Sequence, residues 1–470
     1  MTPARRALLA IALFAGTFAL YSATRHNGFV AYDDGTYVAQ NEHIADGLSL
    51  GAVRWAISST TYACNWHPLT WISHMIDVSL FSMDPAGHHL HAAGLHALNA
   101  ALLFLVLASL TGAPRRSFVV AALFAVHPLR VESVAWVSER KDLLAGFWGI
   151  AALGAHGAFA RGRGARFAVL TALFLALGLA AKPTLVTLPA LLLVLDRWPL
   201  RRTDPWIRLV REKWALFALA ALSSAMTLHS QSAGGCTEFI DDGVRFGARI
   251  ANAVVAYGHY LGAFLFPHDL AIFYPHPAVV TPDASRLPAV LFAGTALGLV
   301  SLVAIRVRRS VPGLLAGWLW FLGMLVPVIG FVQVGGQAFA DRYAYLPMVG
   351  LELAAVFAGA ALLVTRRREA VLVATAAVAI LAARTHGQIR VWRSTRTLFE
   401  HALEVTEHNY VAHANLGRLD GTRGDLASAK RHFQLAVEDN PDFYEGRLNL
   451  GWALNLEGDY PSALQQLDRA

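Results

Sequence analysis

The chain has 470 residues, of which 56% are hydrophobic and only 15% are charged. Soluble domains carry about 25% charged residues, so the composition excludes an ordinary soluble globular protein and predicts a polytopic membrane protein. The net charge of +7 does not indicate a nucleic-acid partner, because the arginines form short clusters between apolar runs, as the loop charges that orient membrane spans do.

The first apolar run follows Arg5 and Arg6 and has no clear signal-peptidase site before Arg25, so we interpret it as an uncleaved first span. A bilayer core about 30 Å thick needs about 20 apolar residues per helix. By that measure the candidate spans are 6–24, 90–111, 116–128, 140–159, 165–181, 183–196, 214–230, 248–267, 287–305, 312–331, 345–365 and 369–385.

The basic loops predict which ends of these spans face the cytoplasm, because positive charge is retained inside. If the N-terminus is inside, three further basic loops fall inside as well, namely 115–116, 161–166 and 197–213. The loop 306–309 should also be inside, yet three candidate spans separate it from the preceding basic loop. One of those three candidates therefore cannot cross.

The segment 248–267 is the one that we expect not to cross, because Asn252, Tyr257, His259 and Tyr260 make it the most polar of the three. Such a segment is either re-entrant or packed inside the bundle. The predicted fold class is thus all-α, a membrane bundle of about 11 spans with one re-entrant segment.

The membrane domain is predicted to occupy residues 1–386, with its first outer loop at 25–89 and further outside segments at 129–139, 231–286 and 332–344. Cys64 and Cys236 both fall in outside segments, so we expect a disulfide bond between them.

A polar tail follows from residue 387 and is predicted to lie outside the membrane as well. Asn415-Leu416-Gly417 recurs as Asn449-Leu450-Gly451, and Gly424-Asp425 recurs as Gly458-Asp459, at a period of 34 residues. That period is typical of tetratricopeptide helix pairs. The domain 387–470 is therefore predicted to be a fragment of an α-solenoid, which serves either as a spacer or as a groove for a peptide.

Adjacent carboxylates, Asp33 and Asp34, stand a few residues beyond the first span. Neighbouring acids in a poorly solvated place raise each other's pKa, so one of them can act as a general base near neutral pH. The alternative is an ordinary turn or helix cap.

Several cations share the predicted outer side of the membrane with this acidic pair. Their position opposes the positive-inside tendency, so something other than the orientation of the spans must explain it. A bound phosphate is the simplest explanation. The candidate phosphate-binding residues are Arg140, Lys141, Lys182 and Arg342. The alternative is internal pairing, of Arg140 with Glu139 or Asp142 and of Arg342 with Asp341, whereas Lys182 has no partner nearby in the sequence.

Other polar residues on this side are candidates for lining the site. They are His67, His89, His96, Asn99, Glu132, Glu139 and Tyr343. His89, His96 and Asn99 share one face of a predicted span, so they either line the site or bond to neighbouring helices. The histidines are numerous, but no carboxylate lies at ligand spacing from them, so we assign no metal and no cofactor.

Five strings of the sequence carry a resemblance to a known family. They are Tyr32-Asp33-Asp34, Trp66-His67-Pro68-Leu69-Thr70-Trp71, Gly87-His88-His89 with Asn99, His127 to Leu144, and Asp341-Arg342-Tyr343-Ala344-Tyr345-Leu346-Pro347. In these strings the chain resembles the transmembrane and tetratricopeptide-repeat O-mannosyltransferases, and it is most similar to their bacterial branch.

The resemblance implies an inverting GT-C glycosyltransferase of the bacterial inner membrane that takes a hexose from a polyprenyl phosphate on the outer face. It places the catalytic base on Asp33 or Asp34, and the donor-phosphate contacts on the four cations named above. It also implies a hydroxyl acceptor, which is either a Ser or Thr of a protein held by the repeats or a hydroxyl group of a glycan or lipid. The brief tail departs from the animal enzymes at this point. The rival classes are a membrane scaffold that presents the repeats and a transporter, although no internal repeat of the two halves supports the latter.

Overall fold

The structure is a computed structural model that describes residues 1–234, 244–282, 284–331 and 335–470. Every regular element in these ranges is a helix, which confirms the predicted all-α class. Cys64 is disulfide-bonded; its expected partner, Cys236, lies outside the described residues.

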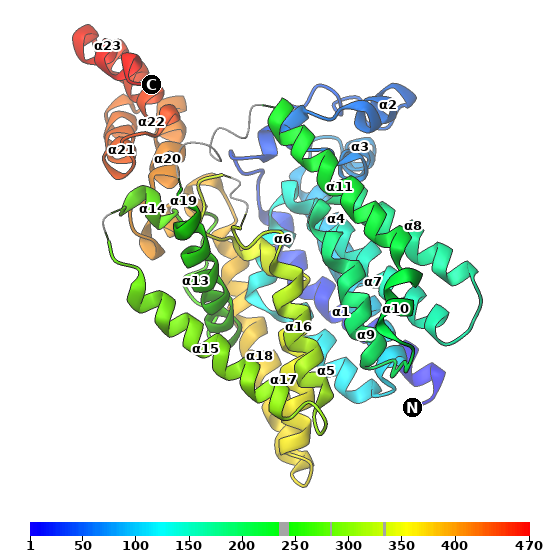
Figure 1. The fold of residues 1–470 in the computed structure, drawn as a ribbon. Coiled ribbons are helices and arrows are strands. Elements are labelled where there is room, and N and C mark those ends of the chain that lie inside the picture. Colours follow the sequence, from blue (N-terminus) through cyan, green and yellow to red (C-terminus); the bar gives the residue numbers. More distant parts are fainter. Residues whose placement is uncertain (235–243, 283, 332–334) are drawn as a thin grey trace.

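Helix α1 (Pro3–Tyr21) starts at one end of the molecule, and the segment predicted to be the first outer loop, called the first outer segment, lies at the other end (Figure 1). The side chain of Thr2 caps α1 by accepting a hydrogen bond from the backbone N–H of Arg5. The outer segment contains η1 (Ser22–His26), η2 (Gly35–Ala39), α2 (Leu50–Ser58), η3 (Tyr62–Cys64) and α3 (Pro68–Phe81). Helix α4 (Pro85–Thr111) then enters the bundle.

The bundle is built from the helices that follow, and several of them begin with proline, whose missing N–H costs nothing in a first helical turn. Their bounds are α5 Pro114–Val126, η4 Pro128–Arg130, α6 Val131–Ala135, η5 Val137–Glu139, α7 Arg140–Ala160, α8 Arg166–Ala181, η6 Pro183–Thr187, α9 Leu188–Arg197, α10 Trp206–Glu212, α11 Trp214–Ala233, α13 Phe246–Leu265, α14 Pro277–Val280, α15 Leu287–Arg306, α16 Pro312–Leu325, η7 Asp341–Ala344, α17 Pro347–Leu362 and α18 Arg367–Val391.

Five helical segments of the described chain are long and apolar enough to cross a membrane: Pro3–His26, Pro85–Thr111, Val137–Ala160, Leu287–Arg306 and Arg367–Val391. A sixth is a bent pair, α5 with η4 and α6, which breaks by 61°. Apolar helices of this kind identify a membrane protein. The predicted number of about 11 spans is larger and stays a prediction.

Helix α13 covers the segment expected not to cross, and it is one continuous helix rather than a re-entrant hairpin. Its polar side chains bond to backbone carbonyls of neighbouring segments. Asn252 donates to Ala338 O at 2.7 Å, Tyr257 to Leu322 O at 2.7 Å and Tyr260 to Ala340 O at 2.7 Å. Of the two expected arrangements, a re-entrant segment or a segment packed inside the bundle, these bonds match the second.

The tail forms successive helices at the same end of the molecule as α2 and α3 (Figure 1). They are α19 Thr395–Val405, α20 Tyr410–Thr422, α21 Leu426–Asp439, α22 Tyr444–Glu457 and α23 Tyr460–Asp468. The starts of α20 and α22 are 34 residues apart, as are those of α21 and α23.

The tail touches the membrane domain directly. Asn409 donates to Phe273 O at 3.0 Å, and the side chain of Thr395 accepts a hydrogen bond from the backbone N–H of Ala31 at 2.9 Å. The start of the tail therefore packs against the segment that carries the acidic pair.

Candidate active site

Asp34 is buried and fully engaged in hydrogen bonds. One carboxylate oxygen accepts from the backbone N–H of Val30 at 2.9 Å, and the other accepts from Ser138 twice, from its N–H at 2.9 Å and its hydroxyl at 2.5 Å. Burial raises the pKa of Asp34 to about 6, and the bonds from Ser138 and Val30 limit the increase. Asp34 thus fastens the first outer segment to η5.

Asp33 has different surroundings. Its carboxylate is half-buried, and within the described ranges it interacts through charge alone, with no hydrogen bond to its side chain. Burial raises the pKa of Asp33 above its ordinary value, although the positive charges of Lys141 and Arg342 oppose the increase. A carboxylate with free lone pairs, held close to cations, can accept a proton from an incoming hydroxyl group.

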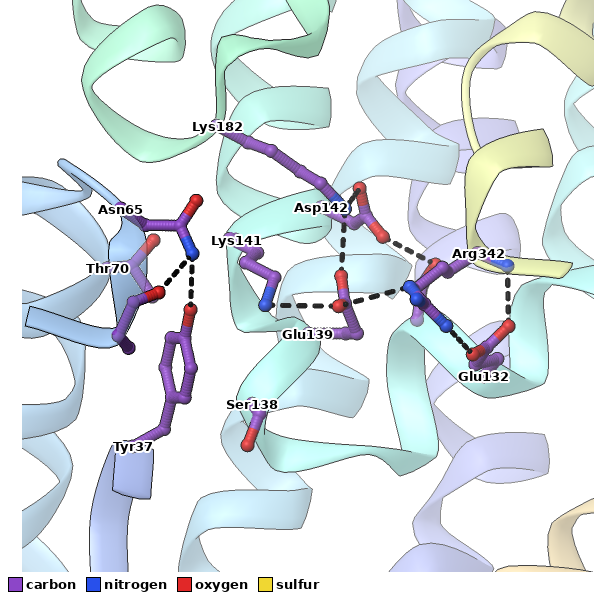
Figure 2. A network of polar contacts seen from close by, with 12 residues as sticks. Tyr37, Asn65, Thr70, Glu132, Ser138, Glu139, Lys141, Asp142, Lys182 and Arg342 are labelled. Carbon is purple, nitrogen blue, oxygen red and sulfur yellow. Dashed lines mark hydrogen bonds and ion pairs between the residues drawn. The ribbon is translucent and has the colours of Figure 1, made fainter. Parts of the chain in front are cut away.

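Three of the predicted cations, Lys141, Lys182 and Arg342, meet in one network (Figure 2), and the charges of Lys141 and Arg342 act on Asp33. Glu139 is at its centre, 3.1 Å from Lys141 Nζ, 2.8 Å from Lys182 Nζ and 3.5 Å from Arg342 Nε. Lys182 also pairs with Asp142 at 2.8 Å. Three segments distant in sequence, α7, the end of α8 and η7, therefore supply one cluster of charge.

Arg342 is fixed by hydrogen bonds and by contacts with aromatic rings. Its backbone N–H and Nη1 both donate to Glu132 at 2.6 Å, and its guanidinium lies over the rings of Trp136 and Tyr343. Its second terminal nitrogen, Nη2, makes no ion pair with a described residue. This nitrogen is available to a ligand.

A pocket adjoins the network on the side of η7. Five of its residues are apolar, and its polar residues include Asp142, Arg342 and Tyr343. The lining residues are Asp142, Ala145, Thr184, Met324, Val328, Arg342, Tyr343, Tyr345, Leu346 and Pro347. A second pocket, between α13 and α14, shares none of these residues and contains no residue of the acid and cation network.

His67 is buried beside the same cations. Burial, and then the charges of Lys141 and Lys182, hold the pKa of His67 well below its ordinary value. The imidazole is therefore neutral at physiological pH. Tyr343, another candidate for lining the site, borders the pocket, and its hydroxyl accepts a hydrogen bond from Gln337 at 2.9 Å.

The polar face of α4 is used for helix packing. His96 Nδ1 and Asn99 Nδ2 lie 2.9 Å and 3.0 Å from the hydroxyl of Tyr345, which itself borders the pocket. Asn99 also donates to Leu143 O, and His89 lies 3.4 Å from Gly28 O. His96 and Asn99 therefore bond to neighbouring helices rather than line the pocket. Tyr345 lies between them and the pocket.

Arg140 is separate from the other three cations. It is fully buried and pairs with Asp77 at 2.8 Å, and it also donates to His88 O at 2.7 Å. The expected partners, Glu139 and Asp142, were wrong, because helix α3 brings a carboxylate from an earlier part of the chain. Both terminal nitrogens of Arg140 are engaged by Asp77, Ser73 and the His88 carbonyl, so a contact between Arg140 and a donor phosphate stays a prediction.

Two further pairings differ from those expected. Arg342 pairs with Glu132 and Glu139, whereas Asp341 accepts a hydrogen bond from Tyr274 at 3.1 Å. Lys182 has no partner nearby in the sequence, but it has two in the folded chain. Internal ion pairing therefore accounts for much of the positive charge on the predicted outer side.

Sequence reasoning missed Ser138, which orients Asp34, and Tyr37, whose ring lies 4.4 Å from Lys141 Nζ. It treated Asp142 only as an ion-pair partner, although this residue also accepts from Ser133 and borders the pocket. Ser138 and Asp142 could have been found from the family resemblance, since both lie within residues 127–144, one of the five strings that carry it.

Comparison with known proteins finds several relatives that are named protein O-mannosyl-transferases. No protein-family model matches the chain. Human protein O-mannosyl-transferase TMTC4 is 25% identical over 90% of this chain and 65% of its own length, and human protein O-mannosyl-transferase TMTC1 is 24% identical over 94% and 56%. The chain is a distant homologue of these enzymes.

A shorter stretch is more similar. Protein O-mannosyl-transferase Tmtc1 of Drosophila melanogaster is 32% identical over 133 residues, which are 27% of this chain and 15% of that relative. The chain spans less than two thirds of the length of these relatives. Each of these relatives carries the name protein O-mannosyl-transferase.

Proposed function

We propose that the chain is a membrane glycosyltransferase that moves mannose, or a similar hexose, from a polyprenyl phosphate to a hydroxyl group, with Asp33 as the general base. The observation that carries the proposal is the contrast within the acidic pair. Asp34 has both oxygens occupied by hydrogen bonds, whereas Asp33 presents a free carboxylate beside the cation network.

The reaction is a single displacement. The acceptor oxygen forms a bond to the anomeric carbon while the bond from that carbon to the phosphate oxygen breaks, and the acceptor proton passes to Asp33. Polyprenyl phosphate leaves with the electron pair. Because phosphate is a good leaving group, no general acid is needed, and a single displacement inverts the anomeric centre.

The cation network is suited to the departing phosphate. Lys141, Lys182 and Arg342 converge on Glu139, and the charges of Lys141 and Arg342 act on Asp33. The free Nη2 of Arg342 is available to a phosphate oxygen. Stabilisation of this kind is strong in a poorly solvated site, where fixed donors need no reorganisation. The apolar lining of the adjoining pocket suits the lipid next to the phosphate.

The loop charges and the positions of the two ends of the molecule support one side of the membrane for the site. The N-terminus carries Arg5 and Arg6 and lies opposite the end with α2, α3 and the tail (Figure 1). The positive-inside tendency supports an extracytoplasmic position for the site and the tail, and the resemblance to the bacterial branch supports a bacterial inner membrane. The acceptor is a protein Ser or Thr, which the helical repeats of the tail present.

The test uses purified full-length protein in lipid vesicles with three radiolabelled donors: polyprenyl-phosphate mannose, polyprenyl-phosphate glucose and a nucleotide-linked mannose. We expect label on acceptor protein from a polyprenyl donor only, with a β-linked donor giving an α-linked product. Label from the nucleotide donor alone contradicts the proposal. A transporter would carry donor across the bilayer without labelling protein, and a scaffold would do neither.

A further inference from the structure

Three histidines and one aspartate meet where α3 packs on the beginning of α4, apart from the site described above. His74 and Asp77 are three residues apart on α3, and His88 and His91 are three residues apart on α4. Side chains with this spacing leave the same face of a helix. Each helix therefore directs two potential metal ligands at the other.

The ligand atoms are already close together. Those of His74, Asp77 and His88 all lie within 4.8 Å of one another, and His88 Nδ1 is 3.5 Å from Asp77 Oδ2. His91 Nδ1 contacts the other oxygen of Asp77. A tetrahedral zinc ion with bonds of about 2.0–2.1 Å holds its ligand atoms about 3.3 Å apart. A small contraction would give three ligands, from His74, Asp77 and His88. His91 has to turn to supply the fourth, because its Nδ1 also lies 2.9 Å from Arg140 Nη1.

The histidine nitrogens in this cluster need partners. Both ring nitrogens of His74 and Nδ1 of His88 make no hydrogen bond with any residue in the described ranges, and both side chains are fully buried. Buried polar atoms are nearly always paired, because an unpaired one costs free energy. A neutral imidazole directs a lone pair at its partner, as a metal ligand does.

Arg140 supports the aspartate from outside the cluster. Its guanidinium lies 2.8 Å from Asp77 Oδ2 and also donates to Ser73 at 3.2 Å and to His88 O at 2.7 Å. Carboxylate ligands are commonly oriented by such an outer partner. Its positive charge disfavours a hard cation held by charge alone, whereas imidazole nitrogens bind zinc and similar transition metals.

We propose that His74, Asp77, His88 and His91 bind one divalent transition metal ion of the zinc class, which fastens the first outer segment to α4. Four protein ligands leave no open position, so the site is structural rather than catalytic. His91 is 31% exposed and provides the route of entry. Sequence reasoning assigned no metal because it overlooked Asp77, which lies three residues after His74, and because it could not show that α3 packs on the beginning of α4.

Metal content tests the proposal. Full-length protein is purified in detergent without a histidine tag, exposed to zinc, dialysed and analysed by mass spectrometry for bound metals. We expect one zinc per chain in the wild type and less than a tenth of that in His74→Gln and His88→Gln. His413→Gln is the matched control, because His413 and His432 form a histidine pair in the tail, 3.0 Å apart. This control should retain the zinc.

Thermal unfolding gives a second readout that does not depend on the variants folding equally well. A chelator should lower the melting temperature of the wild type and leave that of His74→Gln unchanged. Wild-type protein that holds no stoichiometric metal after exposure to zinc overturns the proposal. Zinc that is lost from His413→Gln but kept by His74→Gln overturns it as well.

Discussion

Asp33 and Asp34 are neighbours in the sequence, and the folded chain gives them different tasks. The hydrogen bonds from Ser138 and Val30 make Asp34 part of the scaffold, while the charges of Lys141 and Arg342 surround Asp33. The sequence could predict the pair as a candidate site. It could not predict which acid is free, because Ser138 is 104 residues from Asp34 along the chain.

The pH dependence of transfer should reflect the raised pKa of Asp33. A base works only when it is ionised, so activity should rise with pH through the pKa of Asp33, at a higher pH than an ordinary aspartate would give. Lys141→Met removes a charge that lowers this pKa, so the acidic limb of the profile should move to still higher pH. The measurement is kcat/KM against pH.

Lys430→Met is the control for that experiment, because Lys430 pairs with Glu457 on the tail, far from Asp33 along the chain. Its profile should match that of the wild type. An acidic limb that stays in place in Lys141→Met, whatever the loss in rate, would contradict the electrostatic coupling between Lys141 and Asp33.

At the scale of elements, the close approach of α16 and α17 positions η7 and therefore Arg342. A Cβ atom added at Gly317 would lie 2.8 Å from the backbone nitrogen of Ala354, and it would also contact the backbone of Gly350. Small residues allow such close packing between membrane helices. The helices were predictable from hydropathy, whereas this contact was not, since it depends on how two helices meet.

Gly317→Ala should therefore lower the melting temperature and the rate of transfer together, because it separates α16 from α17. Gly323→Ala, also on α16, has open space within 4 Å and should leave both unchanged. Thermal unfolding and transfer are measured on the same preparations. Equal stability of the two variants would show that the close approach of the helices is unimportant.

Another element contact joins the tail to the acidic pair. Thr395 accepts a hydrogen bond from Ala31, two residues before Asp33, and the ring of Phe399 packs edge-on against Tyr32. Thr395→Val removes the acceptor, at a cost of about 1 kcal/mol. We expect a lower kcat with little change in KM for the donor.

The matched control for Thr395→Val is Thr422→Val, since among the described residues the hydroxyl of Thr422 bonds only to Leu419 O, within its own helix. Steady-state kinetics of both variants give the comparison. If Thr395→Val turns over like the control, the tail does not support the segment that carries Asp33.

At the scale of the whole molecule, composition was sufficient to predict a helical membrane protein, and the period of 34 was sufficient to predict the helices of the tail. The ion-pair partners were not predictable in the same way. Lys182 pairs with Glu139 and Asp142 across 43 and 40 residues, and only the packing of α7 against α8 brings them together.

The proposed topology makes a prediction at this scale. A cysteine in place of Lys430, in the tail, should react in intact cells with a maleimide that cannot cross membranes. A cysteine in place of Arg163, in the basic loop between α7 and α8, should react only after the membrane is opened. The reverse pattern would place the site on the cytoplasmic face.

The rate of transfer from radiolabelled polyprenyl-phosphate mannose, in membranes with matched amounts of each variant, tests the central claim most directly. Asp33→Asn should lower the rate by about 10²–10⁴-fold with an unchanged melting temperature, because it removes only the base. Asp34→Asn should lower both, and Asp46→Asn, exposed in the same segment, should lower neither. A wild-type rate in Asp33→Asn would contradict the assignment of Asp33 as the base.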